Sequence, residues 1–343
     1  MAITLKEIAR IAGVSFQAVS AALNDTPGIR VSPEKREMIR KIAAELGYQR
    51  NFCYNLMHNK QTNTAAIVVA MPRMAQEEHL RILVLELMNR FNEMQIATYY
   101  FDRMTESIEE NLNHIRRLIS RGVEAFIMIG SPLGHCEIQQ EFKSRNCTFI
   151  CFDAPLLERN LQPDSFEMRR KIIDLIRQKT GENFKLILPS TTRDSSYNRL
   201  LKWLYPGSET KTVWNDKVFE LPPFSWDINE QFLFECGWQA TARLLEKEPH
   251  IRGFIFPSDS FALGSGGYLE TQGFTVGKDV FVSGFNANNS VKMQKMPIIT
   301  AELPYKEAVD ILIRESYLTQ PFAGTIHWEL ITGNTFFNKM AAK

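Results

Sequence analysis

Residues 16–23 form a short predicted helix whose outward positions hold Phe16, Gln17, Ser20 and Ala21. A glutamine amide both donates and accepts, so it matches the donor and acceptor on the edge of an adenine, and an aromatic ring can cover a thymine methyl group. The N-terminal half of a helix is the part that meets base edges in the major groove. This group of side chains therefore predicts direct contact with DNA bases.

A preceding helix is needed to hold these side chains in place. Thr4 and Glu7 have the T-x-x-E spacing of a capping box, which fixes the start of that helix. Gly13 can adopt the positive φ that ends it, and Ser15 can then accept the free amides of the next helix. The apolar residues of the first helix recur at helical spacing, at Leu5, Ile8, Ala9, Ile11 and Ala12.

A third helix completes the small core. Ser32 caps it, Pro33 occupies its first position and Gly47 ends it. Its inward residues are Ile39, Ile42, Ala43 and Leu46, and those of the second helix are Ala18, Val19, Ala22 and Leu23. Three short helices with a tight turn at residues 12–14 form a helix-turn-helix, which predicts docking on double-stranded DNA.

This segment resembles the headpiece of the LacI/GalR family of bacterial transcription regulators. The family string T-[IL]-x-[DE]-[IV]-A-x-x-A-G-V-S-x-x-x-V-S-x-x-L-N, followed by E-L-G-Y, is matched by Thr4, Leu5, Glu7, Ile8, Ala9, Ala12, Gly13, Val14, Ser15, Val19, Ser20, Leu23, Asn24, Glu45, Leu46, Gly47 and Tyr48. The resemblance implies a sequence-specific regulator, expected to be a repressor, that binds a pseudo-palindromic operator as a homodimer. It implies DNA contacts at Thr4, Ser15, Phe16, Gln17, Ser20, Ala21, Asn24, Arg30, Tyr54 and Met57. Many relatives carry arginine at position 21, so the alanine predicts fewer guanine contacts in each half-site.

Residues 50–61 resemble the family's hinge, which folds over the operator when two subunits meet. The resemblance places Met57 at the position whose side chain wedges into the minor groove, and methionine is long and apolar enough for that role. Tyr54 stands where alanine is usual, and Arg50 replaces a frequent proline. These departures leave hinge geometry and operator preference open.

The charge distribution agrees with a DNA-binding N-terminus. The formal net charge of the 343 residues is +1, but residues 1–60 hold nine Lys/Arg against five Asp/Glu, which leaves the remainder negative. The positive end is therefore the end that phosphate contacts require. No signal peptide or run of 18 apolar residues is present, so we expect a cytoplasmic, nucleoid-associated bacterial protein without membrane contact. Cys147 and Cys151 are expected to be buried, reduced thiols.

Beyond residue 64, short apolar strands alternate with amphipathic helices, which predicts parallel sheets covered on both faces. Two such runs in series predict two α/β lobes that enclose a cleft. The resemblance adds a fold like that of periplasmic binding proteins, with crossings near 160–164, 287–293 and 320–325. The fold class is thus an all-α helix-turn-helix headpiece plus a two-lobe, periplasmic-binding-protein-like α/β domain. We expect the headpiece at 1–49, the hinge at 50–61, the N-lobe at 62–162 and 290–322, and the C-lobe at 163–289 and 323–343.

Polar side chains that follow apolar strands mark the expected ligand site, because ligands bind at the carboxyl ends of parallel strands. Family strings are matched locally by FIFPSDSFALG, DVFVSGFN, ECGWQATARLL and the segment from Ser196 to Trp203. These matches, and the positions of residues relative to the predicted helices and strands, are what the resemblance uses to imply an effector site. The implied contacts are His79, Leu80, Ser131, Asp153, Arg193, Ser195, Phe232, Ser258, Asp259 and Asn286. Arg193 offers a fork of donors, Phe232 a flat apolar face, and Asn286 an amide where aspartate is usual. A small-molecule effector, by resemblance a carbohydrate, is expected, with a nucleoside or purine as the alternative.

The sequence offers little support for an enzymatic function. There is no G-x-S-x-G, H-E-x-x-H, P-loop or C-x-x-C, and the six histidines show no ligand spacing, so we expect no catalysis, no cofactor and no metal site. The last residues, 338–343, have no leucine heptads, which favours a dimer over a tetramer. The alternative function is a ligand-binding receptor of the same fold with weak or lost DNA binding.

Overall fold

The computed structural model describes residues 3–24, 29–48, 62–70, 78–102, 104–105, 107–155, 157–189, 196–209, 213, 216–221, 230–294 and 296–332. The chain divides into two compact units, residues 1–62 and 63–343. We call the three-helix part of the first unit the headpiece and the second unit the main body. The main body contains an N-lobe and a C-lobe, which are defined below by their sheets.

The headpiece consists of α1 (Leu5–Ala12), α2 (Phe16–Asn24) and α3 (Pro33–Glu45). The predicted capping box is present, since Glu7 N–H donates to Thr4 Oγ1 (3.3 Å) and Thr4 N–H donates to Glu7 Oε2 (2.9 Å). Gly13 ends α1 with a φ of 64°, the left-handed conformation that glycine adopts without strain. The buried core is made by Ile8, Ala9, Val19, Ala22, Leu23, Ile39 and Ala43.

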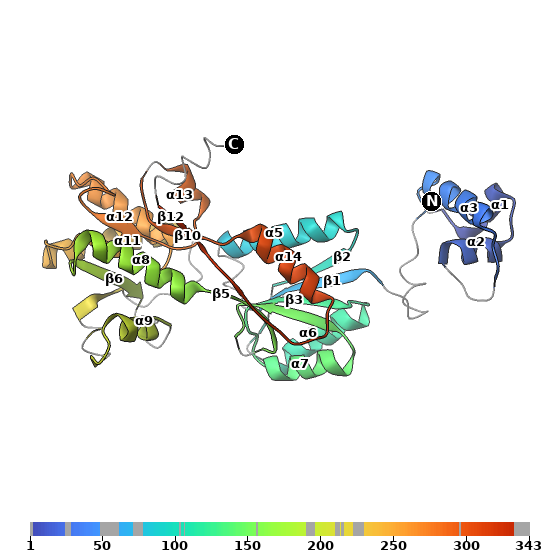
Figure 1. Cartoon of the computed structure of the whole chain (residues 1–343), viewed down its shortest axis with the longest axis horizontal. Helices are drawn as coiled ribbons and strands as arrows, with labels where there is room; N and C mark the ends of the chain where they lie inside the picture. Colours follow the sequence, from blue (N-terminus) through green and yellow to red (C-terminus); the bar gives the residue numbers. More distant parts are fainter. Residues whose placement is uncertain are drawn as a thin grey trace. The chain divides into compact units, whose positions relative to one another are not determined.

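The N-lobe is built on a six-stranded parallel sheet with the order β11-β5-β4-β3-β1-β2. Its strands are β1 (Thr64–Val69), β2 (Ala97–Phe101), β3 (Ala125–Ile129), β4 (Thr148–Phe152), β5 (Arg159–Pro163) and β11 (Phe322–Ile326). Its helices are α5 (Glu78–Glu93), α6 (Ile108–Ser120), α7 (His135–Ser144) and α14 (Tyr305–Ser316). Helices α5 and α14 lie side by side on one face, and α6 and α7 cover the other (Figure 1).

Strand β1 shows why this sheet has no solvent-facing side. All six of its residues are buried. Ala65, Ile67 and Val69 join the core under α5 and α14, whereas Ala66 and Val68 join the core under α6 and α7. A continuous apolar run is what a strand needs when helices cover both faces of its sheet.

The C-lobe is built on a four-stranded parallel sheet with the order β7-β6-β8-β9, beside an antiparallel pair, β10 and β12. Its strands are β6 (Phe184–Pro189), β7 (Val218–Leu221), β8 (Gly253–Ile255), β9 (Phe281–Ser283), β10 (Thr300–Glu302) and β12 (Glu329–Ile331). Its helices are α8 (Ser165–Thr180), α9 (Ser196–Leu204), α11 (Glu230–Lys247), α12 (Asp259–Thr271) and α13 (Asn289–Met293).

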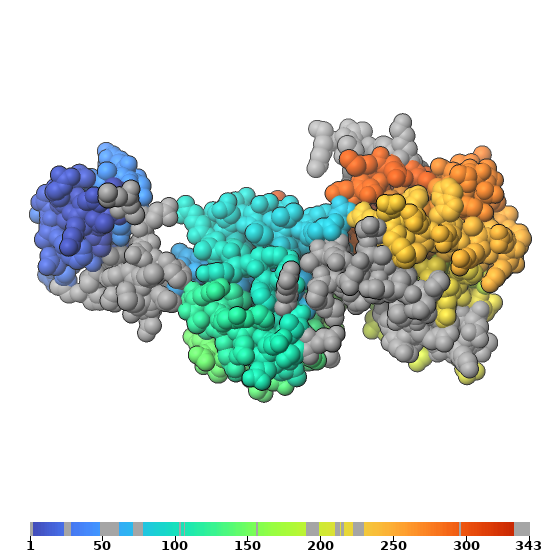
Figure 2. Space-filling view, turned by 180° about the vertical axis from the view of Figure 1, so that it is seen from behind, coloured from blue at the N-terminus to red at the C-terminus, as the bar shows by residue number. Residues whose placement is uncertain are grey.

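Two glycines let α11 and α12 pack backbone to backbone. A Cβ at Gly237 would collide with the carbonyl of Phe261, and one at Gly264 with the carbonyl of Phe234. The gold surface of α11 and the orange surface of α12 are adjacent in Figure 2. The glycines of the α12 sequence therefore serve close helix packing.

The chain passes between the lobes at residues 163–164, 303–304 and 327–328. The expected second crossing near 287–293 is wrong, because Val291 and Ile298 lie in the C-lobe core and Ser283 bridges Ile299. Residues 290–302 therefore belong to the C-lobe. Residues 323–326, assigned to the C-lobe from the sequence, pair with β5 in the N-lobe sheet.

Among the described residues, no helix combines the length and the apolar composition that a membrane crossing requires.

Candidate functional site

Helix α2 presents the predicted base-reading side chains. Ser15 Oγ accepts a hydrogen bond from the main-chain N–H of Ala18 (3.2 Å), so this serine caps the helix. Phe16 is 45% exposed and Gln17 is exposed, while Ser20 is half-buried. The first turn of α2 thus offers an aromatic ring and an amide to solvent.

Ala21 corrects the sequence analysis, which placed it on the outward face. The residue is fully buried. Arg36 of α3 reaches across to α2 and donates from Nη1 to the carbonyl of Ala21 (3.3 Å). Ala21 is therefore covered where α2 and α3 pack and does not lie on the exposed face of α2.

Of the other predicted DNA contacts, some are exposed and some lie outside the described residues. Thr4 is exposed, but its hydroxyl is used in the capping box, and its hydrogen bonds lower the pKa of Glu7. Arg30 is exposed. The side chain of Asn24 and all of Tyr54 and Met57 lie outside the described residues.

In the main body, four predicted residues stand at the carboxyl ends of parallel strands. Ser131 follows β3 and Asp153 follows β4 in the N-lobe, while Ser258 and Asn286 follow β8 and β9 in the C-lobe. The hydroxyls of Ser131 and Ser258 are buried and have no hydrogen-bond partner within the described part of the chain. Buried hydroxyls without partners are costly, so these two are suited to a ligand's polar groups.

Backbone strain is concentrated at the same strand ends. Asp153 has a φ of 57°, Asn286 of 91° and Ala287 of 47°, in the left-handed region that side chains with a Cβ disfavour. Such conformations persist only where surrounding contacts hold them, and they are frequent at ligand sites. Here Ala287 N–H donates to Thr300 Oγ1 (3.1 Å), which fixes the loop after β9.

Asp259 packs against this loop and accepts a hydrogen bond from it. Its side chain is fully buried, and its Oδ2 accepts from the main-chain N–H of Asn288 (2.7 Å). A Cβ at Gly284 would collide with the Asp259 carboxylate, so the glycine allows the loop to cross directly over it. Burial raises the pKa of Asp259 to about 7, although hydrogen bonds from Thr300 and the main chain oppose the shift. Asp259, a predicted site residue, therefore stabilises the loop after β9.

An aromatic cluster fills the junction between the lobes. Trp328 lies 4.6 Å from Phe285 of the C-lobe and 6.0 Å from His79 of the N-lobe, measured between ring centroids. The guanidinium of Arg169 stacks 4.1 Å above the Phe285 ring. Burial, assisted by the positive charge of Arg169, lowers the pKa of His79 to about 3. His79 is therefore neutral and packed in the core.

Trp328 and Arg169 were not predicted from the sequence, because no motif surrounds them. Leu80, which it proposed as a lining residue, is 3% exposed and belongs to the apolar core. Phe232 is 37% exposed on the first turn of α11. Arg193 and Ser195 lie outside the described residues.

A wide hollow lies elsewhere, on the N-lobe. An open groove of about 670 Å³ runs along α6 and the end of α7, lined by Glu110, Asn113, His114, Arg116, Arg117, Ser120 and Arg145. It does not include any strand end. A crevice of about 10 Å³ beneath Arg169 and Phe285 has room for no more than a single water. Within the described ranges, no group of three acidic, histidine or cysteine side chains is placed to hold a metal.

Residues 4–51 match the family of bacterial regulatory proteins called lacI. The N-terminal segment therefore carries a helix-turn-helix of the lacI type. The matched segment contains the whole headpiece, with the capped α1, the exposed Phe16 and Gln17, and helix α3.

Curated relatives are similar to this chain over nearly its full length. The ribose operon repressor of Haemophilus influenzae is 24% identical over 323 residues, covering 91% of each chain. The regulator RegA of Clostridium saccharobutylicum is 23% identical over 319 residues, covering 92% of this chain and 91% of RegA. These relatives are regulators rather than enzymes.

Among solved structures, the lac repressor dimer bound to operator and the anti-inducer ONPF has the same fold. The TM-score is 0.69 at 17% identity, with 98% of this chain and 99% of that chain covered. The agreement confirms the expected architecture of a helix-turn-helix headpiece and a two-lobe α/β main body.

Proposed function

We propose that this chain is a cytoplasmic, dimeric transcription regulator that binds operator DNA through α2 and binds a carbohydrate between the lobes of the main body. The observation that supports the effector site is that Ser131, Asp153, Ser258 and Asn286 each follow the carboxyl end of a parallel strand, two in each lobe. A carbohydrate suits them because hydroxyl, amide and carboxylate groups pair with sugar hydroxyls. The similar ribose operon repressor supports the same ligand class.

For the DNA site, we propose that Phe16 and Gln17 read bases and that the exposed Arg30 contacts phosphate. Lobe movement changes operator affinity through linkage, since an effector that favours one lobe arrangement also favours the headpiece geometry coupled to it. Tyr54 and Met57 are proposed to act at the minor groove.

Thermal unfolding of the full chain with D-ribose, cellobiose and adenosine tests the effector. A ligand at 100 times its dissociation constant stabilises the folded state by about 2.7 kcal/mol. Asn286→Ala should abolish the stabilisation, while Asn113→Ala on the exposed face of α6 should keep it. Stabilisation by adenosine alone would favour the nucleoside alternative.

Gel-shift titration on promoter DNA at two salt concentrations tests the DNA site. Affinity should fall steeply with salt, because phosphate contacts release counterions. Gln17→Ala should weaken specific binding by about 1–3 kcal/mol without changing the salt dependence. Full-length protein that binds sugar but shows no salt-dependent DNA binding would instead be a receptor with lost DNA binding.

A further inference from the structure

The first turn of α5 reaches from the N-lobe to the C-lobe. Glu78 Oε2 accepts a hydrogen bond from the main-chain N–H of Asn289 (3.2 Å), and Glu78 Oε1 accepts one from the Asn289 side-chain amide (2.6 Å). In Figure 2, the light-blue start of α5 lies beside the gold and orange surface of the C-lobe. One carboxylate therefore uses both of its oxygens on a single residue of the other lobe.

A second polar contact between the lobes starts from the same turn but is weaker. Arg81 Nη2 lies 3.9 Å from Glu230 Oε1, and both side chains are 48% exposed. At this distance the two groups form no hydrogen bond, and solvent and salt screen their attraction. The two charge-assisted hydrogen bonds of Glu78 are shorter and more directional, so they dominate.

The residue that Glu78 holds is directly joined to the strained loop after β9. Asp259 and Thr300 fix Asn288 and Ala287 within the C-lobe. Asn289 is the next residue, and its partner is in the N-lobe. The loop that carries Asn286 is thus attached to both lobes at once.

We propose that Glu78 is a positioning residue that latches the loop of residues 285–289 to the N-lobe and holds the lobes together before an effector binds. Movement of the lobes apart must break both hydrogen bonds to Asn289. The latch bears on the proposed function because the same loop presents Asn286, so the latch presets the distance between the two halves of the effector site.

Hydrogen–deuterium exchange of the full chain, with no sugar and no DNA, tests the latch. Glu78→Ala should speed exchange of amides 289–293 by roughly tenfold. The reciprocal variant Asn289→Ala should speed exchange at residues 80–83 of α5, an effect in the other lobe that a purely local change at α13 would not produce. Asn289→Ala removes only the side-chain hydrogen bond, because the main-chain N–H of residue 289 remains. The double variant should therefore match Glu78→Ala and not exceed it, as expected of two residues that share one interaction.

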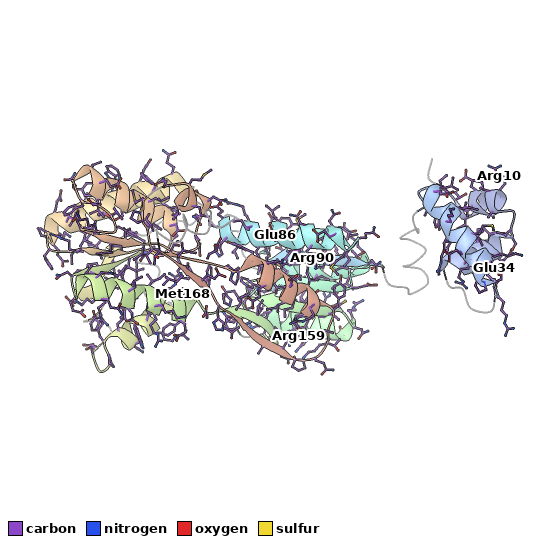
Figure 3. All side chains as sticks on the ribbon, turned by 45° about the horizontal axis from the view of Figure 1, so that its top comes forward. Arg10, Glu34, Glu86, Arg90, Arg159 and Met168 are labelled. Atoms are coloured by element: carbon purple, nitrogen blue, oxygen red, sulfur yellow. The ribbon has the colours of Figure 1, made fainter. Side chains whose placement is uncertain are left out.

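Glu86→Ala is the matched control, since Glu86 is an exposed acid two turns further along α5 (Figure 3). It should leave both regions unchanged. Glu78→Gln keeps the side chain's size and one acceptor, so it should give an intermediate effect and carries the test if Glu78→Ala fails to fold. Additive effects, or exchange in Glu78→Ala equal to that in Glu86→Ala, would overturn the latch. Failure of sugar binding would leave these exchange results unaffected, so the two proposals fail separately.

Discussion

The carboxylate of Asp164 accepts a hydrogen bond from the main-chain N–H of Trp328 (2.9 Å), which joins the first and third crossings between the lobes. Its other oxygen pairs with His327 Nδ1 (2.7 Å), and Trp328 Nε1 donates to Ser165 Oγ (3.2 Å). Two segments that are more than 160 residues apart in sequence are therefore held together beside the aromatic cluster. This junction ties two of the three crossings between the lobes to each other.

Replacement of Asp164 by alanine should lower the free energy of unfolding by about 1–3 kcal/mol. The variant leaves the partly buried N–H of Trp328 without its acceptor. Urea unfolding measures the loss. Asp174→Ala on the same helix is the control and should shift the midpoint by far less. Equal midpoints for the two variants would contradict a junction role for Asp164.

Acid sensitivity should depend on His79. Its pKa is about 3 in the folded state and near 6.5 in the unfolded chain, so the unfolded state binds more protons between these values. Stability is therefore lost as the pH falls below 6.5, by about 2 kcal/mol between pH 6.5 and 5. His79→Gln should flatten the curve of unfolding free energy against pH between pH 5 and 6.5. This holds whether or not the substitution also changes the stability at neutral pH.

The control for His79 is His250→Gln, because His250 is exposed. Its curve of unfolding free energy against pH should keep the wild-type slope. A His79→Gln curve parallel to that of the wild type would show that His79 titrates normally. Arg169 is the charged group that acts on His79, so Arg169→Met should raise the pKa of His79 only in part, since burial is the larger cause.

Arginine at position 21 should destabilise the headpiece rather than add a guanine contact. Ala21 is fully buried beneath Arg36, and enlarging a buried side chain costs about 1–3 kcal/mol. Ala44→Arg on the exposed side of α3 is the matched control. Exchange rates of the headpiece amides report the difference. Equal protection in the two variants would show that position 21 can turn outward.

A buried ion pair and an exposed one allow a direct comparison within the N-lobe. Arg159, labelled in Figure 3, pairs with Glu315 at 3.3 Å, and its side chain is 4% exposed. Glu315→Ala leaves a buried charge unpaired and should cost about 3–5 kcal/mol. Glu158→Ala, which breaks the exposed pair with Lys143, should change the free energy of unfolding far less, because solvent screens an exposed pair. Similar losses in urea unfolding would contradict this ranking.

Local patterns predicted the elements that carry their own signal. The capping box at Thr4 and Glu7 predicted the start of α1, and the apolar residues that begin beyond residue 64 predicted β1. Strand β5 has no such signal, because Arg159, Asn160 and Gln162 are polar. It is a strand because Arg159 finds Glu315, and Asn160 Oδ1 accepts from Ala154 N–H (2.8 Å), partners that only the tertiary fold supplies.

The candidate site was predicted to a similar degree. Strand ends could be read from the sequence, so Ser131 and Asn286 were named. Trp328 and Glu78 act through residues of the other lobe, and no spacing in the sequence reveals such a pairing. Ala21 was misplaced because helical periodicity gives a face but not the reach of Arg36 from the next helix.

The edge strand β11 has a consequence for synthesis of the protein on the ribosome. Synthesis of β5 is complete at residue 163, but the last strand of the N-lobe sheet, β11, is complete only at residue 326. Helix α14 is synthesised shortly before β11. At about 5–20 residues per second, the ~160 intervening residues take roughly 8–32 s to translate. Throughout that interval the nascent N-lobe has an open β5 edge and no cover from α14, so this is the period in which a chaperone would protect it.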